Sequence, residues 1–240
     1  MIVNYAPSGW EIITQRSHGL LAAQICAQWR KDDQPERWIE TLIATAEHDD
    51  VYNEFENDDL LNENGGPVHY EATSFRKAYA ERLMGMAETK SAYVALLVSQ
   101  HIQFVHGADS KAKQFIASLK IKEKRWLKIA DSSKSEVSRG YALLQFCDAM
   151  SLLLCQNKVP PEQRKIEIST GPGGIAYTMW EQEGILIVDP WPFEERTFKL
   201  RYESRMLPQL SYSSVAEFRK AIEEAEVVTR VLELATKIKI

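Results

Sequence analysis

The sequence changes character at Val159-Pro160-Pro161, and this change most constrains the fold. Before it, apolar residues recur at intervals of three and four, which is the spacing of helices with one buried face. After it, short β-branched and aromatic stretches alternate with Gly and Pro, as in strands joined by turns. We therefore predict a helical body over residues 1–158 and a small α+β part over residues 159–240 that packs on it.

The helical spacing predicts a first helix over 17–30 with Thr14 or Ser17 as its N-cap, and a second helix that Pro35 opens. Further helices are expected over 74–87, 92–106, 111–129 and 136–156. Strands are expected over 166–169, 175–180, 185–188 and 198–202, and Ser213 or Ser214 can cap a short helix to Glu224. Residues 227–235 fit either a strand or a helix. Residues 2–14 predict a hairpin broken at Pro7-Ser8-Gly9.

The predicted fold class is therefore mainly α: a helical bundle with a small antiparallel sheet near the C-terminus, which the N-terminal hairpin can join. The net charge of -5 argues against a protein that binds nucleic acid polymers or anionic membranes. The longest apolar run, residues 93–98, is far shorter than the ~20 residues that span a bilayer. The first residues also lack the basic start and apolar run of a signal peptide. We expect a cytoplasmic protein with a small-molecule partner.

Cys26, Cys147 and Cys155 fall in apolar helical stretches and are odd in number, so we expect reduced core thiols. No CxxC pair is present to bind zinc through thiolates. The acidic stretch 47–63 lacks EF-hand spacing, and the Gly-rich stretch 171–174 lacks the Lys-Ser/Thr of a phosphate loop. These segments predict a loop and a turn.

Three predicted helices each carry one titratable side chain on their apolar face. His18 shares a face with Ala22, Ile25 and Trp29, because these residues lie at i, i+4, i+7 and i+11. The same spacing joins His101 to Val94 and Leu97, and Asp148 to Leu144 and Leu152. A buried carboxylate is costly without a partner, so Asp148 should have a partner or a metal. Singly, each histidine fits a hydrogen-bonded core residue, and Asp148 fits an Arg partner or a backbone cap. Together they suit Mn²⁺, Fe²⁺, Zn²⁺ or Mg²⁺.

A fourth element, His48-Asp49, ends the second predicted helix. Asp49 lies near the edge of the apolar stripe of that helix, and His48 lies on its far side. An adjacent His-Asp pair at a helix end can still bind one ion, although the position of His48 on the helical wheel argues against it.

The order His18, His48-Asp49, Asp148 on successive helices resembles the HD superfamily of metal-dependent phosphohydrolases. The resemblance implies an HD-like bundle in which His18, His48, Asp49 and Asp148 bind a divalent cation. It also implies a role for His101, which resembles the extra histidine that some HD enzymes use for a second metal or for the substrate phosphate.

A closer likeness covers nearly the whole chain. Residues 9–15 (GWEIITQ), 47–50 (EHDD), 96–101 (LLVSQH) and 148–155 (DAMSLLLC) are similar to a family of uncharacterised bacterial proteins. Those proteins share a Trp-Pro-Phe element, which stands here at residues 191–193. They often have Gly-Trp after the His-Asp-Asp, where this chain has Val51-Tyr52.

The leading functional hypothesis is a metal-dependent phosphohydrolase acting on a small phosphorylated metabolite or nucleotide. In it, His101 donates a proton or contacts the phosphate, and Arg16 is a phosphate ligand. One alternative is a non-haem iron oxygenase of HD-like fold. Another is a non-catalytic sensor or interaction module in which the site is degenerate.

Overall fold

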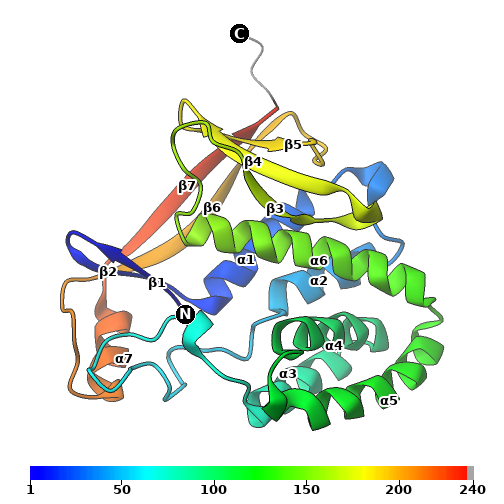
Figure 1. Cartoon of the computed structure of the whole chain (residues 1–240), viewed down its shortest axis with the longest axis horizontal. Helices are drawn as coiled ribbons and strands as arrows, with labels where there is room; N and C mark the ends of the chain where they lie inside the picture. Colours follow the sequence, from blue (N-terminus) through cyan, green and yellow to red (C-terminus); the bar gives the residue numbers. More distant parts are fainter. Residues whose placement is uncertain (237–240) are drawn as a thin grey trace.

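In the computed structural model, which describes residues 1–236, a curved seven-stranded sheet packs against a group of helices (Figure 1). The helices are α1 (Gln15–Ala27), α2 (Trp38–Glu47), α3 (Lys77–Glu88), α4 (Ala92–His106), α5 (Lys113–Ala130), α6 (Lys134–Cys155) and α7 (Val215–Glu224). The strands are β1 (Ile2–Ala6), β2 (Gly9–Ile13), β3 (Ile166–Thr170), β4 (Ala176–Gln182), β5 (Ile185–Asp189), β6 (Thr197–Leu207) and β7 (Val227–Ala235).

Side-chain caps fix where several of these helices begin. The Thr14 side chain accepts a hydrogen bond from the Ser17 backbone N–H, so the expected N-cap of α1 is confirmed. Ser133 and Glu136 form a reciprocal capping box at the start of α6. Ser214 caps α7 in the same way as Thr14 caps α1, by accepting from Glu217 N–H. The caps are local, which is why the sequence indicated those of α1 and α7; it did not identify Ser133, and the predicted start of α6 at residue 136 is two residues late.

The sheet shows that the predicted fold class was wrong: the protein is α+β, not mainly α or all-α. Its strand order is β1-β2-β6-β7-β5-β4-β3, and it is mixed because β5 and β7 are parallel. The predicted sheet was too small for two reasons. The segment 227–235, ambiguous in sequence, is the strand β7 within the sheet. The strand β6 continues past Tyr202 to Leu207 through the buried polar Ser204, which breaks the apolar pattern.

The N-terminal hairpin belongs to this sheet. Trp10 and Ile12 of β2 lie opposite Leu207 and Arg205 of β6. Because β2 comes from the start of the chain and β6 from its last third, the sheet includes residues from both sides of residue 158.

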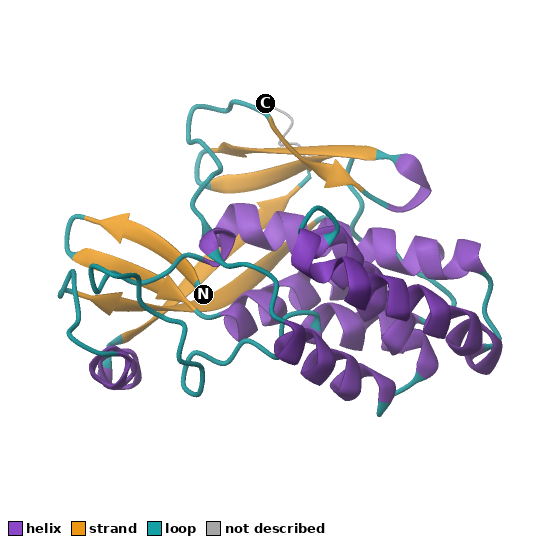
Figure 2. Cartoon of the chain, turned by 60° about the horizontal axis from the view of Figure 1, so that its bottom comes forward, coloured by secondary structure: helices purple, strands orange, loops and turns teal. Residues whose placement is uncertain are grey.

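Helices α1 and α6 lie between the sheet and the remaining helices (Figure 1). One hydrophobic core joins α1 and α6 to the sheet, and within it Trp29 makes edge-to-face contacts with Phe146, Tyr177 and Phe193. A second core lies among α2 to α6. Figure 2 shows the helices other than α7 gathered on one side of the molecule and the strands on the other, with α7 beside the strands. Polar residues on the inner faces of α1 and α6 are consequently enclosed.

No helix in residues 1–236 combines the length and the apolar character needed to cross a membrane.

Candidate metal centre

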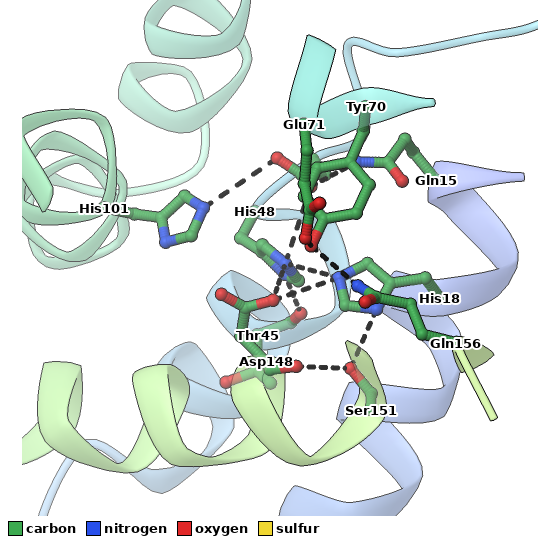
Figure 3. A network of polar contacts seen from close by, with 11 residues as sticks. Gln15, His18, Thr45, His48, Tyr70, Glu71, His101, Asp148, Ser151 and Gln156 are labelled. Carbon is green, nitrogen blue, oxygen red and sulfur yellow. Dashed lines mark hydrogen bonds and ion pairs between the residues drawn. The ribbon is translucent and has the colours of Figure 1, made fainter. Parts of the chain in front are cut away.

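Five of the predicted site residues meet in the interior, although they come from four helices. His18 lies on α1, His48 and Asp49 at the end of α2, His101 on α4 and Asp148 on α6. Figure 3 shows His18, His48 and Asp148 pointing toward one another, with His101 on the opposite side of His48 from His18. His18 and His48 are fully buried, and the Asp148 side chain is 10% exposed.

The three innermost donor atoms form a nearly equilateral triangle. His18 Nε2 lies 3.2 Å from His48 Nε2 and 3.1 Å from Asp148 Oδ1. His48 Nε2 lies 3.3 Å from the same oxygen. We call these three residues the triad.

A close approach of two helices brings His18 and His48 together. Gly19, next to His18, sits where a Cβ atom would lie 2.6 Å from the Ala46 carbonyl oxygen, so only Gly allows α1 to pass α2 at this distance. The ring centroids of His18 and His48 are 5.1 Å apart as a result.

Hydrogen bonds on the outer side of both rings fix their tautomers. His48 Nδ1 lies 2.7 Å from the Thr45 carbonyl oxygen, which can only accept, so Nδ1 carries the hydrogen. Ser151 Oγ donates to the Asp148 carbonyl oxygen at 2.8 Å. Its single hydrogen is then used, so at 2.8 Å from His18 Nδ1 it accepts from that nitrogen. In the neutral rings both Nε2 atoms therefore face the triad as lone pairs.

Lone pairs from two imidazoles and a carboxylate repel at these distances unless a cation lies among them. The shifted pKa values of His48 and Asp148 also indicate that the triad favours a positive charge. Burial opposes the charged imidazolium, yet Asp148 and Asp49 raise the pKa of His48 to about 9. Burial likewise opposes ionisation of Asp148, but the charge of His48 and the close contacts with the His18 and His48 rings hold the pKa of Asp148 well below its usual range. The triad attracts positive charge, either a proton or a metal ion.

The spacing of the triad fits a divalent ion. Ligand atoms about 2.1 Å from one ion are about 3.0 Å apart at right angles and about 3.4 Å apart in a tetrahedron. The triad distances of 3.1 to 3.3 Å lie within that interval. Imidazole nitrogen and carboxylate oxygen also suit Zn²⁺, Mn²⁺ and Fe²⁺. His18, His48 and Asp148 would hold such an ion, with Asp49 beside them.

Asp49 and His101 extend the centre. Asp49 Oδ2 lies 3.9 Å from His48 Nε2, and Asp49 Oδ1 lies 3.8 Å from His101 Nε2. Burial opposes its ionisation, but the charge of His48 and the interactions with His101 lower the pKa of Asp49 to about 2. Gln15 Nε2 donates to Asp49 Oδ2 at 2.9 Å and orients the carboxylate. Among the described residues, His101 Nδ1 has no hydrogen-bond partner.

The centre opens into a cavity of about 580 Å³. Asp49, His101 and Asp148 line one part of it, and the segment 51–76 supplies much of the rest, including Tyr52 and Tyr70. This volume is in the range of small-molecule sites. His18 and His48 lie behind this wall, which places the ligand atoms at the inner end of an accessible space.

One protein-family model matches most of the chain. A family model described as "Protein of unknown function (DUF3891)" matches residues 1–209. The chain belongs to the DUF3891 family. No curated protein and no solved structure matches it. All five residues of the centre lie within the DUF3891 match, whereas α7 and β7 lie beyond it.

One predicted site residue of this DUF3891 protein is not near the centre. The Arg16 guanidinium donates to the Asp50 carbonyl oxygen at 3.0 and 2.8 Å and pairs with the Asp50 carboxylate at 3.2 Å. The side chain is 41% exposed, and it does not line the cavity. The structure thus brings together the five other predicted residues and leaves Arg16 at the surface.

The wheel argument against His48 was misleading. Helix α2 contacts α1, α4 and α6, so more than one of its faces is buried. His48, at the C-cap of α2, is therefore fully buried although it lies off the main apolar stripe.

Sequence reasoning missed the supporting residues Thr45, Ser151 and Gln15. Each lies three positions from a site residue on the same helix or its end: Thr45 before His48, Ser151 after Asp148 and Gln15 before His18. Polar side chains at i±3 from a candidate ligand share its helix face, and this was the available signal.

Proposed function

We propose that this DUF3891 protein is a metal-dependent phosphohydrolase that acts on a small phosphorylated metabolite or nucleotide. The observation that carries the proposal is the triad, in which Thr45 and Ser151 hold both outer ring nitrogens. Two imidazole lone pairs and one carboxylate oxygen then converge at the end of a cavity.

The order of the residues adds support. His18, His48-Asp49 and Asp148 follow one another on successive helices, as do the ligands in HD phosphohydrolases, which this chain resembles. The proposal also includes a cytoplasmic location. The three free, buried cysteines support it, because thiols persist in reducing compartments.

The protein residues have distinct tasks in this reaction. A divalent ion, when bound, binds the phosphate and lowers the pKa of the attacking water. His18, His48 and Asp148 fix its position, and Asp49, oriented by Gln15, adds negative charge. The water oxygen forms a bond to phosphorus, the ester P–O bond breaks, and the leaving oxygen takes a proton. His101 lines the cavity, with its Nε2 3.8 Å from Asp49 Oδ1, and is suited to donate that proton.

The first test compares melting curves with Mn²⁺ and with chelator. The wild type is expected to gain about 2.7 kcal/mol at a metal concentration of about 100 times Kd, or on the order of 5–10 °C. Asp148→Asn should lose this gain, because it removes a ligand charge. The control Asp32→Asn, at an exposed carboxylate outside the centre, should keep it. A wild type that melts at the same temperature in both conditions contradicts the metal centre and favours the non-catalytic module.

The second test measures turnover. The metal-loaded protein should release phosphate from p-nitrophenyl phosphate, and His101→Gln should lower kcat by about 10²–10⁴ while retaining the metal. Iron-dependent oxygen consumption without phosphate release would instead assign the centre to an oxygenase.

A further inference from the structure

The cavity beside the centre is lined by more acidic than basic side chains. Six carboxylates line it: Asp49, Glu54, Asp58, Asp59, Glu71 and Asp148. Among its described lining residues, Arg76 is the one Arg or Lys side chain, and it pairs with Asp59. A polyanion entering this cavity would meet no free cationic side chain.

The remaining cations at and around the cavity do not cancel this excess. Asp58 pairs with Arg219 at 3.0 Å, and Glu71 lies 3.7 Å from Lys158. Glu54 binds the Met1 amine at 3.1 Å. Including these three cations with Arg76 gives four positive charges against six negative charges. One divalent ion at the centre balances the remaining two. The two charges of a bound phosphate then have no counterion from the wall, so a positive charge on the substrate itself is favoured.

Unpaired hydrogen-bonding atoms give independent evidence for a ligand here. Gln15 lines the cavity and is only 4% exposed, and among the described residues its Oε1 has no partner. The amide nitrogen of Gln15 is committed to Asp49, so Oε1 is held as an acceptor that a donor on a ligand can satisfy. Together with the carboxylates, it makes the wall rich in acceptors.

The aromatic lining suits a cation as well. Tyr52 and Tyr79 form an edge-to-face pair with centroids 5.6 Å apart. The Arg76 guanidinium already lies over the Tyr79 ring, 5.6 Å from its centroid. Tyr70 and Glu71 also line the cavity, and their side chains are hydrogen-bonded at 3.2 Å. Tyrosine faces next to carboxylates favour ammonium groups.

We propose that the substrate is a small phosphomonoester whose alcohol part carries an ammonium group. This inference rests on the proposed phosphohydrolase function and names its substrate class. The phosphate lies at the metal centre, and the ammonium lies against Glu71, Asp59 and the tyrosine rings. Water supplies the new P–O bond, the ester P–O bond breaks, and the product alcohol leaves with its ammonium unchanged. Di- and triphosphates are disfavoured, because each added phosphate adds uncompensated charge.

A matched pair of ligands tests the ammonium without needing turnover. The probes are 2-aminoethylphosphonate and 2-hydroxyethylphosphonate, which differ in one group and have a C–P bond that hydrolysis does not cleave. Calorimetry on the Mn²⁺-loaded protein should show that 2-aminoethylphosphonate binds at least about tenfold more tightly than 2-hydroxyethylphosphonate. Glu71→Gln should reduce that preference at least threefold. Because Glu71 is more than half exposed, this variant keeps the fold, whereas the control Asp32→Asn should leave the preference unchanged.

Equal affinity for the two phosphonates, or a preference that Glu71→Gln and Asp59→Asn both leave intact, overturns the inference. Hydrolysis of p-nitrophenyl phosphate is measured in parallel. Turnover together with equal phosphonate affinities refutes the ammonium and keeps the phosphohydrolase. Amine preference without any turnover refutes the phosphohydrolase and keeps the ligand class.

Discussion

Two hydrogen bonds on the outer side of the histidine rings decide what the triad can bind. The partner of His48 is the backbone carbonyl of Thr45, which can only accept a hydrogen bond. The partner of His18 is the hydroxyl of Ser151, which could donate or accept. The backbone carbonyl of Asp148 takes the Ser151 hydrogen and so removes that choice. The residue that supplies the carboxylate therefore also sets the tautomer of His18 through its backbone.

Ser151→Ala is expected to weaken Mn²⁺ binding about 10–100-fold, because His18 loses the acceptor that keeps its Nε2 free. Calorimetric titration measures the change. Ser99→Ala is the matched control, since it also removes a fully buried hydroxyl from a helix. The Ser99 hydroxyl donates to Glu123 and has no contact with the triad. Wild-type affinity in Ser151→Ala would show that the tautomer is set by something else.

At this scale the sequence was a good guide to which residues face inward. His18, His101 and Asp148 were predicted inside from a single-face spacing, and all three are buried. His48 was misjudged because a wheel treats a helix as having one buried face, while α2 contacts three other helices. Whether these side chains bind a metal stays a prediction.

At the scale of elements, an ion pair fastens the N-terminal hairpin to the rest of the sheet. Glu11 of β2 accepts from Arg230 of β7 at 2.9 and 2.6 Å, across the intervening β6. Its other oxygen lies 3.3 Å from the side-chain nitrogens of Asn4 and Asn157. Burial opposes its ionisation, but the hydrogen bonds from Arg230 and Asn4 and the Arg230 charge lower the pKa of Glu11.

A carboxyl whose pKa is lowered on folding stabilises the protein above its unfolded pKa of about 4.3, and this effect is lost as the pH falls through the folded pKa. Glu11→Gln is therefore expected to cost about 1–3 kcal/mol at pH 7. The lower half of this range is expected, because the Arg230 side chain is 42% exposed. This loss of unfolding free energy should become smaller toward pH 4.

Urea unfolding of the wild type and of Glu11→Gln at pH 7, 5 and 4 measures the loss. Glu203→Gln, at an exposed position of β6, is the control, and a cost that does not change with pH contradicts the ion-pair account.

The sheet was the part of the fold that the sequence predicted least well. Helices α1 to α6 are local structures, and their periodicity was legible. Strand β7 gives a weaker signal, because its side chains alternate between exposed and half-buried positions, with Leu234 buried near its end. Its place depends on pairing with Thr197–Leu207, which no local pattern reports.

At the scale of the molecule, β7 joins two halves of the sheet. On one side lie β1, β2 and β6, and on the other lie β5, β4 and β3. The DUF3891 match ends at residue 209, before this strand. The candidate metal centre lies within the matched residues. The sheet that packs on α1 and α6, however, is continuous only when β7, which lies beyond the match, is present.

A chain ended after residue 209 is therefore expected to aggregate or to remain unfolded, since β6 and β5 would both become open edges. Size-exclusion chromatography and circular dichroism measure the outcome. Val231→Lys, at a 52% exposed position of β7, is the control and should remain a folded monomer or native oligomer. A shortened chain with native chromatographic and spectroscopic behaviour would show that the two halves are stable separately.

The central position of β7 has a consequence for protein synthesis. Chains emerge N-terminus first at about 5–20 residues per second. Strands β5 and β6 therefore leave the ribosome before β7, which lies between them in the sheet. The delay is on the order of a second or more. During that interval neighbouring nascent chains could pair with them. Along β6 every second residue is charged: Lys199, Arg201, Glu203 and Arg205. Charges on a temporary edge discourage pairing between chains, so these side chains protect the growing polypeptide until its own strand arrives.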